Sequence, residues 1–195
     1  FNSFKKRGEL INDLQKRSFP AIFLDRFERE TKLPIVTTHH FAAISVLLKK
    51  LLVESPDLVI NLFDPSKNMV EFARRQALSV LMEEKPQLHQ SLTDNQTDQI
   101  LPGKKIVILA SSEIRAKAFV EKRSAELENR ELIIGVFDYW LGPTSPFLKV
   151  FVCQQDFKQM AYQACSLLIS RIQNPTFEIP TKTQIPYKAM LQVSR

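Results

Sequence analysis

Apolar and polar residues alternate along this chain in blocks that predict strands and helices in turn. Short apolar runs, typical of strands buried on both faces, lie at 33–38, 57–64, 104–110, 131–138 and 148–154. Longer segments with apolar residues at helical spacing lie at 39–54, 66–84, 111–128 and 156–172. This alternation predicts βαβ units and an α/β fold with parallel sheets.

The pattern also predicts details of single elements. A first strand is expected at 19–27, a weaker one at 87–92, and an extended, proline-broken tail after 173. Turn and cap chemistry at Asp64, Pro65 and Ser66 should start the second long helix. The stripe predicted to face inward on that helix is Met69, Phe72, Ala73, Gln76, Ala77, Val80 and Leu81.

Composition argues for a folded binding protein rather than an enzyme. Hydrophobic residues make up 44% of the 195 residues, enough for a packed core. Only four glycines are present, and no glycine-rich phosphate loop or G-x-S-x-G nucleophile motif occurs. The three histidines have no metal-ligand spacing, because His39 and His40 are adjacent and would point to opposite sides of an extended segment. The sequence therefore predicts no catalytic triad, no cofactor and no metal.

The net charge of +6 raises the question of a nucleic-acid partner. The basic residues are spread along the chain without interleaved aromatic residues, which favours a solvated surface over a DNA-binding face. No apolar run is long enough to cross a membrane. The basic pI and the two unpaired cysteines favour the cytoplasm.

Polar residues cluster where the predicted strands end. In open parallel sheets, ligands bind at the carboxyl ends of the strands. Carboxylate, guanidinium, amide and hydroxyl groups beside an indole suit a neutral polyhydroxylated ligand, whose apolar face the ring would cover. A structural alternative stays open, since strand ends are commonly polar and such residues also cap turns or fill the core. The candidate ligand-binding residues are Arg74, Ser111, Asp138, Tyr139, Trp140 and Gln155.

The ordered set of segments resembles the effector-binding domain of LacI/GalR-type transcription regulators, which is periplasmic-binding-protein-like. The segments that carry the resemblance, over nearly the whole chain, are "FPAIFLDRF", "VTTHHFAAISVLLKKLLVESPDLVINLFDP", "RRQALSVLM", "VILASSEIRAKAF", "GVFDYW", "VFVCQQDFKQMAYQACSLLISRI" and "IPYKAMLQVS". The chain departs from the family pattern at four places. Ser111-Ser112 replaces an Asn-Asp pair, His39-His40 an Asp-Asn pair, Val136 a glycine and Gln192 an arginine.

The resemblance implies two Rossmann-like lobes with parallel sheets, of the periplasmic-binding-protein-like type I. Residues 1–56 with 154–173 would form an incomplete N-terminal lobe, and 57–150 with 175–195 the C-terminal lobe. Four of the candidate residues, Arg74, Ser111, Asp138 and Gln155, would face a sugar-like effector. The roles of Tyr139 and Trp140 rest on residue type.

The resemblance also implies a function. Effector-dependent closure of the lobes in a bacterial cytoplasmic homodimer would control operator DNA binding, through a DNA-binding head that this chain lacks. The alternative is a periplasmic sugar-binding protein of a transporter, which shares the fold.

Overall fold

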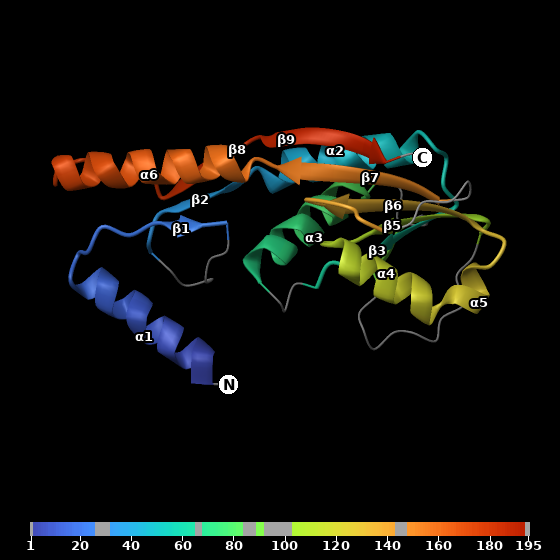
Figure 1. Cartoon of the computed structure of the whole chain (residues 1–195), viewed down its shortest axis with the longest axis horizontal. Coiled ribbons are helices and arrows are strands. Elements are labelled where there is room, and N and C mark those ends of the chain that lie inside the picture. Colours follow the sequence, from blue (N-terminus) through green and yellow to red (C-terminus); the bar gives the residue numbers. More distant parts are fainter. Residues whose placement is uncertain are drawn as a thin grey trace. The chain divides into compact units, whose positions relative to one another are not determined.

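The computed structural model describes residues 2–25, 32–64, 68–83, 89–91, 103–142 and 148–193. The chain divides into two compact units, each built from separate stretches of sequence. The first unit contains Phe1–Thr38 and Asp156–Ile185, and the second contains His39–Gln155 and Pro186–Arg195 (Figure 1).

The first unit is a small parallel sheet packed against a long helix. Its three strands are β1 (Phe23–Leu24), β2 (Ile35–Thr38) and β8 (Lys182–Ile185), in the order β1-β2-β8. Helix α6 (Phe157–Gln173) buries three side chains at helical spacing, Met160, Ala164 and Leu167, against Val36 and Ile185. Helix α1 (Asn2–Lys16) precedes β1.

The second unit is built around a six-stranded sheet in the order β4-β3-β5-β6-β7-β9. The strand pairs are parallel except β7 with β9, which is antiparallel. Continuous burial of β3 and near-continuous burial of β5 show why their sequences are uniformly apolar. The strands are β3 (Leu58–Asn61), β4 (His89–Ser91), β5 (Lys105–Leu109), β6 (Glu131–Phe137), β7 (Leu148–Gln155) and β9 (Tyr187–Val193).

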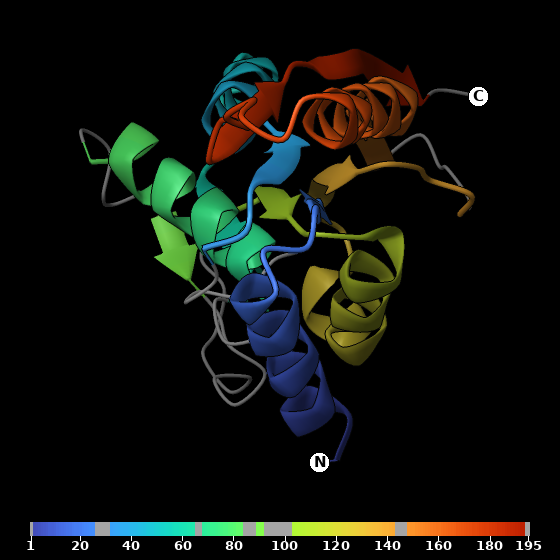
Figure 2. The same ribbon diagram turned by 90° about the vertical axis from the view of Figure 1, so that its left-hand side faces the viewer.

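Helices cover both faces of this sheet. Residues of α2 (His40–Leu52) and α3 (Met69–Leu81) pack in one apolar cluster, and residues of α4 (Glu113–Lys122) and α5 (Ser124–Leu127) in another. Figure 2 shows α2 and α4 on opposite sides of the strands. Gly135 on β6 lets α2 approach closely, because a Cβ there would lie 2.9 Å from Leu51 Cδ1. This sandwich places the carboxyl ends of β3, β5, β6 and β7 along one edge.

The α/β class and the parallel sheets predicted from the sequence are confirmed, with three local corrections. Of the strand expected at 19–27, only Phe23–Leu24 is a strand among the described residues 19–25, and 26–27 lie outside the described residues. Helix α3 begins later than predicted, and its cap is Asn68, whose side chain accepts the Glu71 N–H. Pro65 and Ser66 lie outside the described residues. Of the predicted inward stripe of α3, Ala77 is buried but Val80 is 53% exposed, so the stripe was predicted in the wrong phase.

The division of the chain also differs from the predicted lobes. Residues 39–56 group with the second unit, because α2 packs on α3 and on strands β6, β7 and β9. Residues 175–185 group with the first unit, because β8 pairs with β2. The chain therefore crosses between the units after Thr38, not after the first long helix.

Candidate functional site

A hydrogen bond joins two of the predicted site residues at the carboxyl edge of the second unit. Gln155 Nε2 donates to Asp138 Oδ1 over 2.9 Å. The pairing of β6 with β7 brings them together, because Phe137 lies opposite Cys153 and the Asp138 N–H donates to the Cys153 carbonyl over 3.0 Å. A carboxylate and an amide thus sit side by side where two neighbouring parallel strands end.

Asp138 holds an uncommon backbone conformation. Its φ is +74°, in the left-handed region that side chains other than glycine seldom occupy. The next amide, Tyr139 N–H, turns back to donate to the Phe137 carbonyl over 3.0 Å. Non-glycine residues in this region persist where surrounding structure holds them, and they concentrate at binding and active sites.

Gln155 is placed by an irregularity between β7 and β9. The antiparallel register shifts between Gln154 and Gln155, so Gln155 lies opposite Tyr187 although Gln154 lies opposite Ala189. Such a bulge redirects side chains at the end of a strand. The orientation of the Gln155 amide therefore depends on β9.

Arg74 contacts the residue that precedes Asp138. Its side chain comes from α3, is buried, and places the guanidinium carbon 3.6 Å from the centre of the Phe137 ring. Such a position over an aromatic face is a favourable cation–π contact. Arg74 and Asp138 both act on the neighbouring Cys153 thiol. Burial raises the pKa of that thiol to about 12, with Arg74 opposing the shift and Asp138 adding to it.

The cysteine contributes no nucleophile, since its thiol stays protonated near neutral pH. What remains is a buried cation, a carboxylate and an amide within one small region of the second unit. The structure thus brings together three predicted site residues from separate stretches of sequence, Arg74, Asp138 and Gln155.

The structure does not bring the other three predicted residues into this group. Ser111 is half-buried after β5, next to Ser112, which caps α4. Tyr139 is exposed. Trp140 packs against the apolar cluster on the α4 side of the sheet. Among the residues that the structure describes, no contact links these three side chains to Asp138 or Gln155, and their ligand roles stay predictions.

Sequence reasoning missed a polar cluster at the end of β3. Glu71 is buried in the first turn of α3 and accepts the Asp64 N–H over 2.7 Å. Arg115 of α4 lies 3.8 Å from Glu71 and 3.9 Å from Asp64. Asp64 was recognised as a strand-end residue. The signal for Glu71 was its place three residues after the cap Asn68, a position from which a carboxylate turns back to the helix start.

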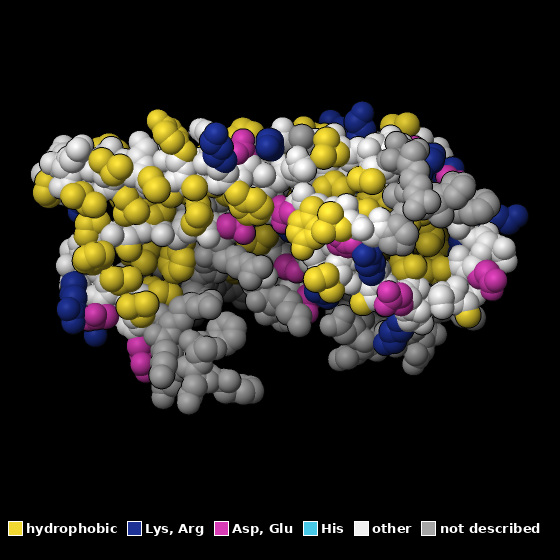
Figure 3. All heavy atoms as spheres, in the orientation of Figure 1, with side chains coloured by type: hydrophobic (Ala, Val, Ile, Leu, Met, Phe, Trp, Pro, Cys, Tyr) yellow, Lys and Arg dark blue, Asp and Glu magenta, His cyan; other side chains and the backbone are white. Residues whose placement is uncertain are grey.

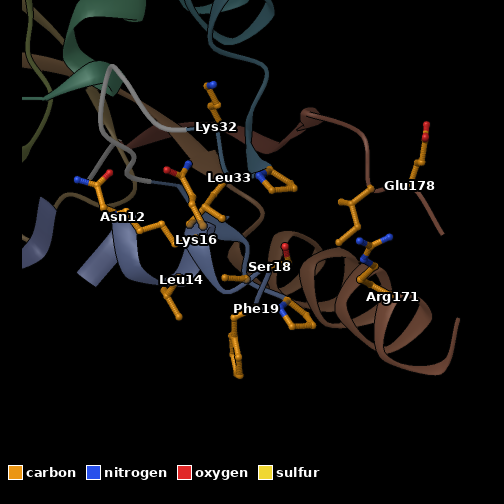
Figure 4. Close-up of a pocket in the computed structure, with 14 residues that line it drawn as sticks. Asn12, Leu14, Lys16, Ser18, Phe19, Lys32, Leu33, Arg171 and Glu178 are labelled. Carbon is orange, nitrogen blue, oxygen red and sulfur yellow. The ribbon is translucent and has the colours of Figure 1, made fainter. Parts of the chain in front are cut away.

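Two hollows in the described chain lie apart from these residues. One, of about 890 Å³, belongs to the first unit and is lined in part by Lys16, Arg171 and Glu178 (Figure 4). The other, of about 680 Å³, lies at the amino ends of β3, β5 and β6 and includes Asp57 and Lys104. Neither contains a predicted site residue, so the candidate site rests on side-chain contacts.

The described residues contain no group of three or more His, Cys, Asp or Glu side chains that could hold a metal ion. Within the same ranges, no helix has the length and apolar character needed to span a bilayer.

Sequence comparison finds no matching family model and no significant match among curated proteins. Structural comparison does find matches. The Cra transcriptional dual regulator of Pseudomonas putida, in complex with fructose 1-phosphate, superposes with a TM-score of 0.72 at 19% identity over 94% of this chain and 72% of that one. A LacI-family regulator from Enterococcus faecalis with bound ribose gives 0.66 at 18% identity, over 96% and 72%.

The same fold occurs in binding proteins. A galactofuranose-binding protein matches with a TM-score of 0.65 at 12% identity, over 95% of this chain and 70% of that one. At such identities the likeness shows the fold. The chain therefore has the periplasmic-binding-protein-like fold of LacI-type effector-binding domains, as its sequence segments predict. This chain covers less than three quarters of the length of each of these solved chains.

Proposed function

We propose that this chain is the effector-binding part of a bacterial LacI-type transcription regulator and that it takes a small polyhydroxylated ligand. The observation that carries the proposal is the Gln155–Asp138 hydrogen bond at the carboxyl edge of a parallel sheet, with the buried Arg74 against the adjacent Phe137. The fold supports it, since solved proteins of this fold hold fructose 1-phosphate and ribose.

The chemistry of the pair suits a ligand with neighbouring hydroxyl groups. A carboxylate accepts about four hydrogen bonds, and Gln155 uses one at Asp138 Oδ1. Bonds from hydroxyl groups to a charged acceptor are stronger than neutral ones. Arg74, whose guanidinium lies against the ring of the neighbouring Phe137, adds a buried cation to the same region. Binding, not catalysis, is the role that these residues favour.

In this proposal the ligand acts as a switch. A ligand that binds one arrangement of the two units more tightly shifts the population toward that arrangement. The shift would alter operator binding by a DNA-reading segment outside these 195 residues, in the bacterial cytoplasm.

We include a homodimer in the proposal, and α6 supports it. Its outer face carries exposed Tyr162, Cys165, Ile169 and Ile172 at alternating intervals of three and four residues. Apolar side chains gather along this helix in Figure 3. A stripe with this spacing is typical of helices that pair with another helix. Light scattering of the purified chain tests whether it forms dimers.

The test of effector binding is a thermal-shift and calorimetry panel of sugars and sugar phosphates. It compares wild type with Asp138→Asn, which keeps an acceptor for Gln155 and tolerates the left-handed backbone but removes the charge. Because bonds to charged groups contribute about 1.5–3 kcal/mol, we expect affinity to fall about tenfold or more. Glu121→Gln, an exposed change on α4, is the control. Equal affinity of all three proteins, or no stabilisation of wild type by any sugar, contradicts the proposal.

A further inference from the structure

The segment Tyr139–Gly142, which follows Asp138, is tied to helix α4 by one buried carboxylate. Glu113, in the first turn of α4, is 4% exposed. Its Oε2 accepts the Leu141 N–H over 2.7 Å, and its carboxylate also accepts the Gly142 N–H. A charged acceptor bonded to two successive backbone amides fixes the path of that backbone.

Lys117 completes the attachment. It lies one turn after Glu113 and forms an ion pair with Glu113 Oε1. Its ammonium group also lies 5.6 Å from the centre of the Trp140 ring. A Cβ at Gly142 would come within 2.5 Å of Lys117 Cε and 3.0 Å of the Trp140 ring, so a larger residue would require the end of the Lys117 side chain to shift. The carboxylate, the lysine, the indole and the glycine form one packed group, named here the α4 latch.

Burial and the partners of Glu113 act in opposite directions on its ionisation. Burial raises the pKa of Glu113, while bonds from Lys117 and from the Leu141 and Gly142 amides lower it. The net result is a pKa below the ordinary 4.5. The carboxylate therefore stays charged near neutral pH, where the latch needs it.

One unfavourable feature lies directly before this segment and another lies within it. Asp138 has a φ of +74°, and the buried indole Nε1 of Trp140 has no hydrogen-bond partner among the described residues. Such features persist only where neighbouring contacts hold them. The α4 latch holds this segment against α4, and its release would let the indole reach water.

We propose that Glu113 is a positioning residue that fixes the segment after β6 and thereby sets Asp138 for the effector. The inference rests on the proposed function for its effector part, while the hold on Trp140 stands by itself. Glu113 contacts Leu141 and Lys117 and bonds neither Asp138 nor Gln155 in the described contacts, so it acts through the backbone.

The test uses Trp140, the single tryptophan of the sequence, as the reporter. In Glu113→Ala we expect red-shifted emission and acrylamide quenching of Trp140 raised about twofold, because the freed indole is exposed to water. Glu113→Gln should restore most of the wild-type signal, since its amide oxygen still accepts the Leu141 N–H. Glu121→Ala on the exposed side of the same helix should leave the signal unchanged. Far-UV circular dichroism verifies that each variant is folded.

Effector affinity provides the second readout. If one tenth of Glu113→Ala molecules hold the segment correctly, the apparent affinity for the sugar falls about tenfold. Unchanged Trp140 emission and quenching in folded Glu113→Ala overturns the latch. A changed Trp140 signal with unchanged sugar affinity overturns the link to the effector. If no sugar binds wild type, the proposed function fails, and the Trp140 readout still decides the latch.

Discussion

The left-handed backbone of Asp138 predicts an inverted order of stability for two substitutions. Asp138→Ala and Asp138→Gly both remove the carboxylate that accepts from Gln155, so that loss is common to both. They differ because alanine places a Cβ atom on a backbone with a φ of +74°, whereas glycine has no Cβ. At most positions alanine is the more stabilising residue, because glycine loses more backbone entropy on folding. Here the Cβ is strained, and glycine should be the more stable.

The magnitude follows from two opposing effects. A left-handed conformation costs an L-residue about 1–2 kcal/mol. The greater freedom of glycine in the unfolded chain costs about 0.4–1 kcal/mol. The free energy of unfolding of Asp138→Gly should therefore exceed that of Asp138→Ala by about 0.5–1 kcal/mol.

Urea unfolding followed by far-UV circular dichroism measures this difference. With a slope of about 2 kcal/mol per molar urea, the midpoint of Asp138→Gly should lie about 0.3–0.5 M above that of Asp138→Ala. Neither variant should bind the effector that stabilises wild type. An alanine variant as stable as the glycine variant, or more stable, would refute the positive φ at this position and the strain argument built on it.

Two further predictions concern ionisable groups. In native protein diluted until light scattering shows monomers, a thiol reagent at mildly alkaline pH should label Cys165, which is exposed in the single chain, but not the buried Cys153, whose pKa is raised to about 12; labelling of both at equal rates contradicts this burial. Hydrogen bonds from the Lys105 and Lys104 amides lower the pKa of Asp57 below its ordinary 3.8. The ionised Asp57 carboxylate stabilises the folded protein, and this stabilisation is complete above the ordinary pKa of 3.8. It is lost as the pH falls through the lowered pKa of Asp57 in the folded state. The urea midpoint of wild type should exceed that of Asp57→Asn at about pH 6, and the gap should shrink at about pH 2.5. If the difference between the two urea midpoints does not change with pH, the hydrogen bonds to Asp57 do not stabilise its ionised form.

Part of the site could be predicted because parallel strands share an edge. Asp138 and Gln155 each follow an apolar strand, and that position alone brings them to the same side of the sheet. Arg74 was predicted from its place near the start of a helix that faces the same edge, and the family-like segment supported that choice. Its contact with Phe137 was not visible in the sequence.

The phase of α3 was missed for a physical reason. The helix buries Glu71 and Arg74 near the sheet edge, so its inward face is partly charged. The stripe of apolar residues on α3 is therefore rotated around the helix axis relative to the stripe of residues that the structure buries. The role of Glu113 was also not predicted. Its partners are backbone amides 28 and 29 residues further along the chain. Hydrophobic periodicity cannot report contacts with backbone groups.

The bulge between β7 and β9 has a consequence for protein synthesis. Gln155 is oriented by pairing with Tyr187, which is translated later than β3, β5, β6 and β7. A nascent chain that has folded β3, β5 and β6 still lacks the strand that aims this amide. The orientation of the Gln155 amide should thus be set only after Tyr187 has been translated and has paired with β7, so an effector that needs this amide could not guide earlier folding steps.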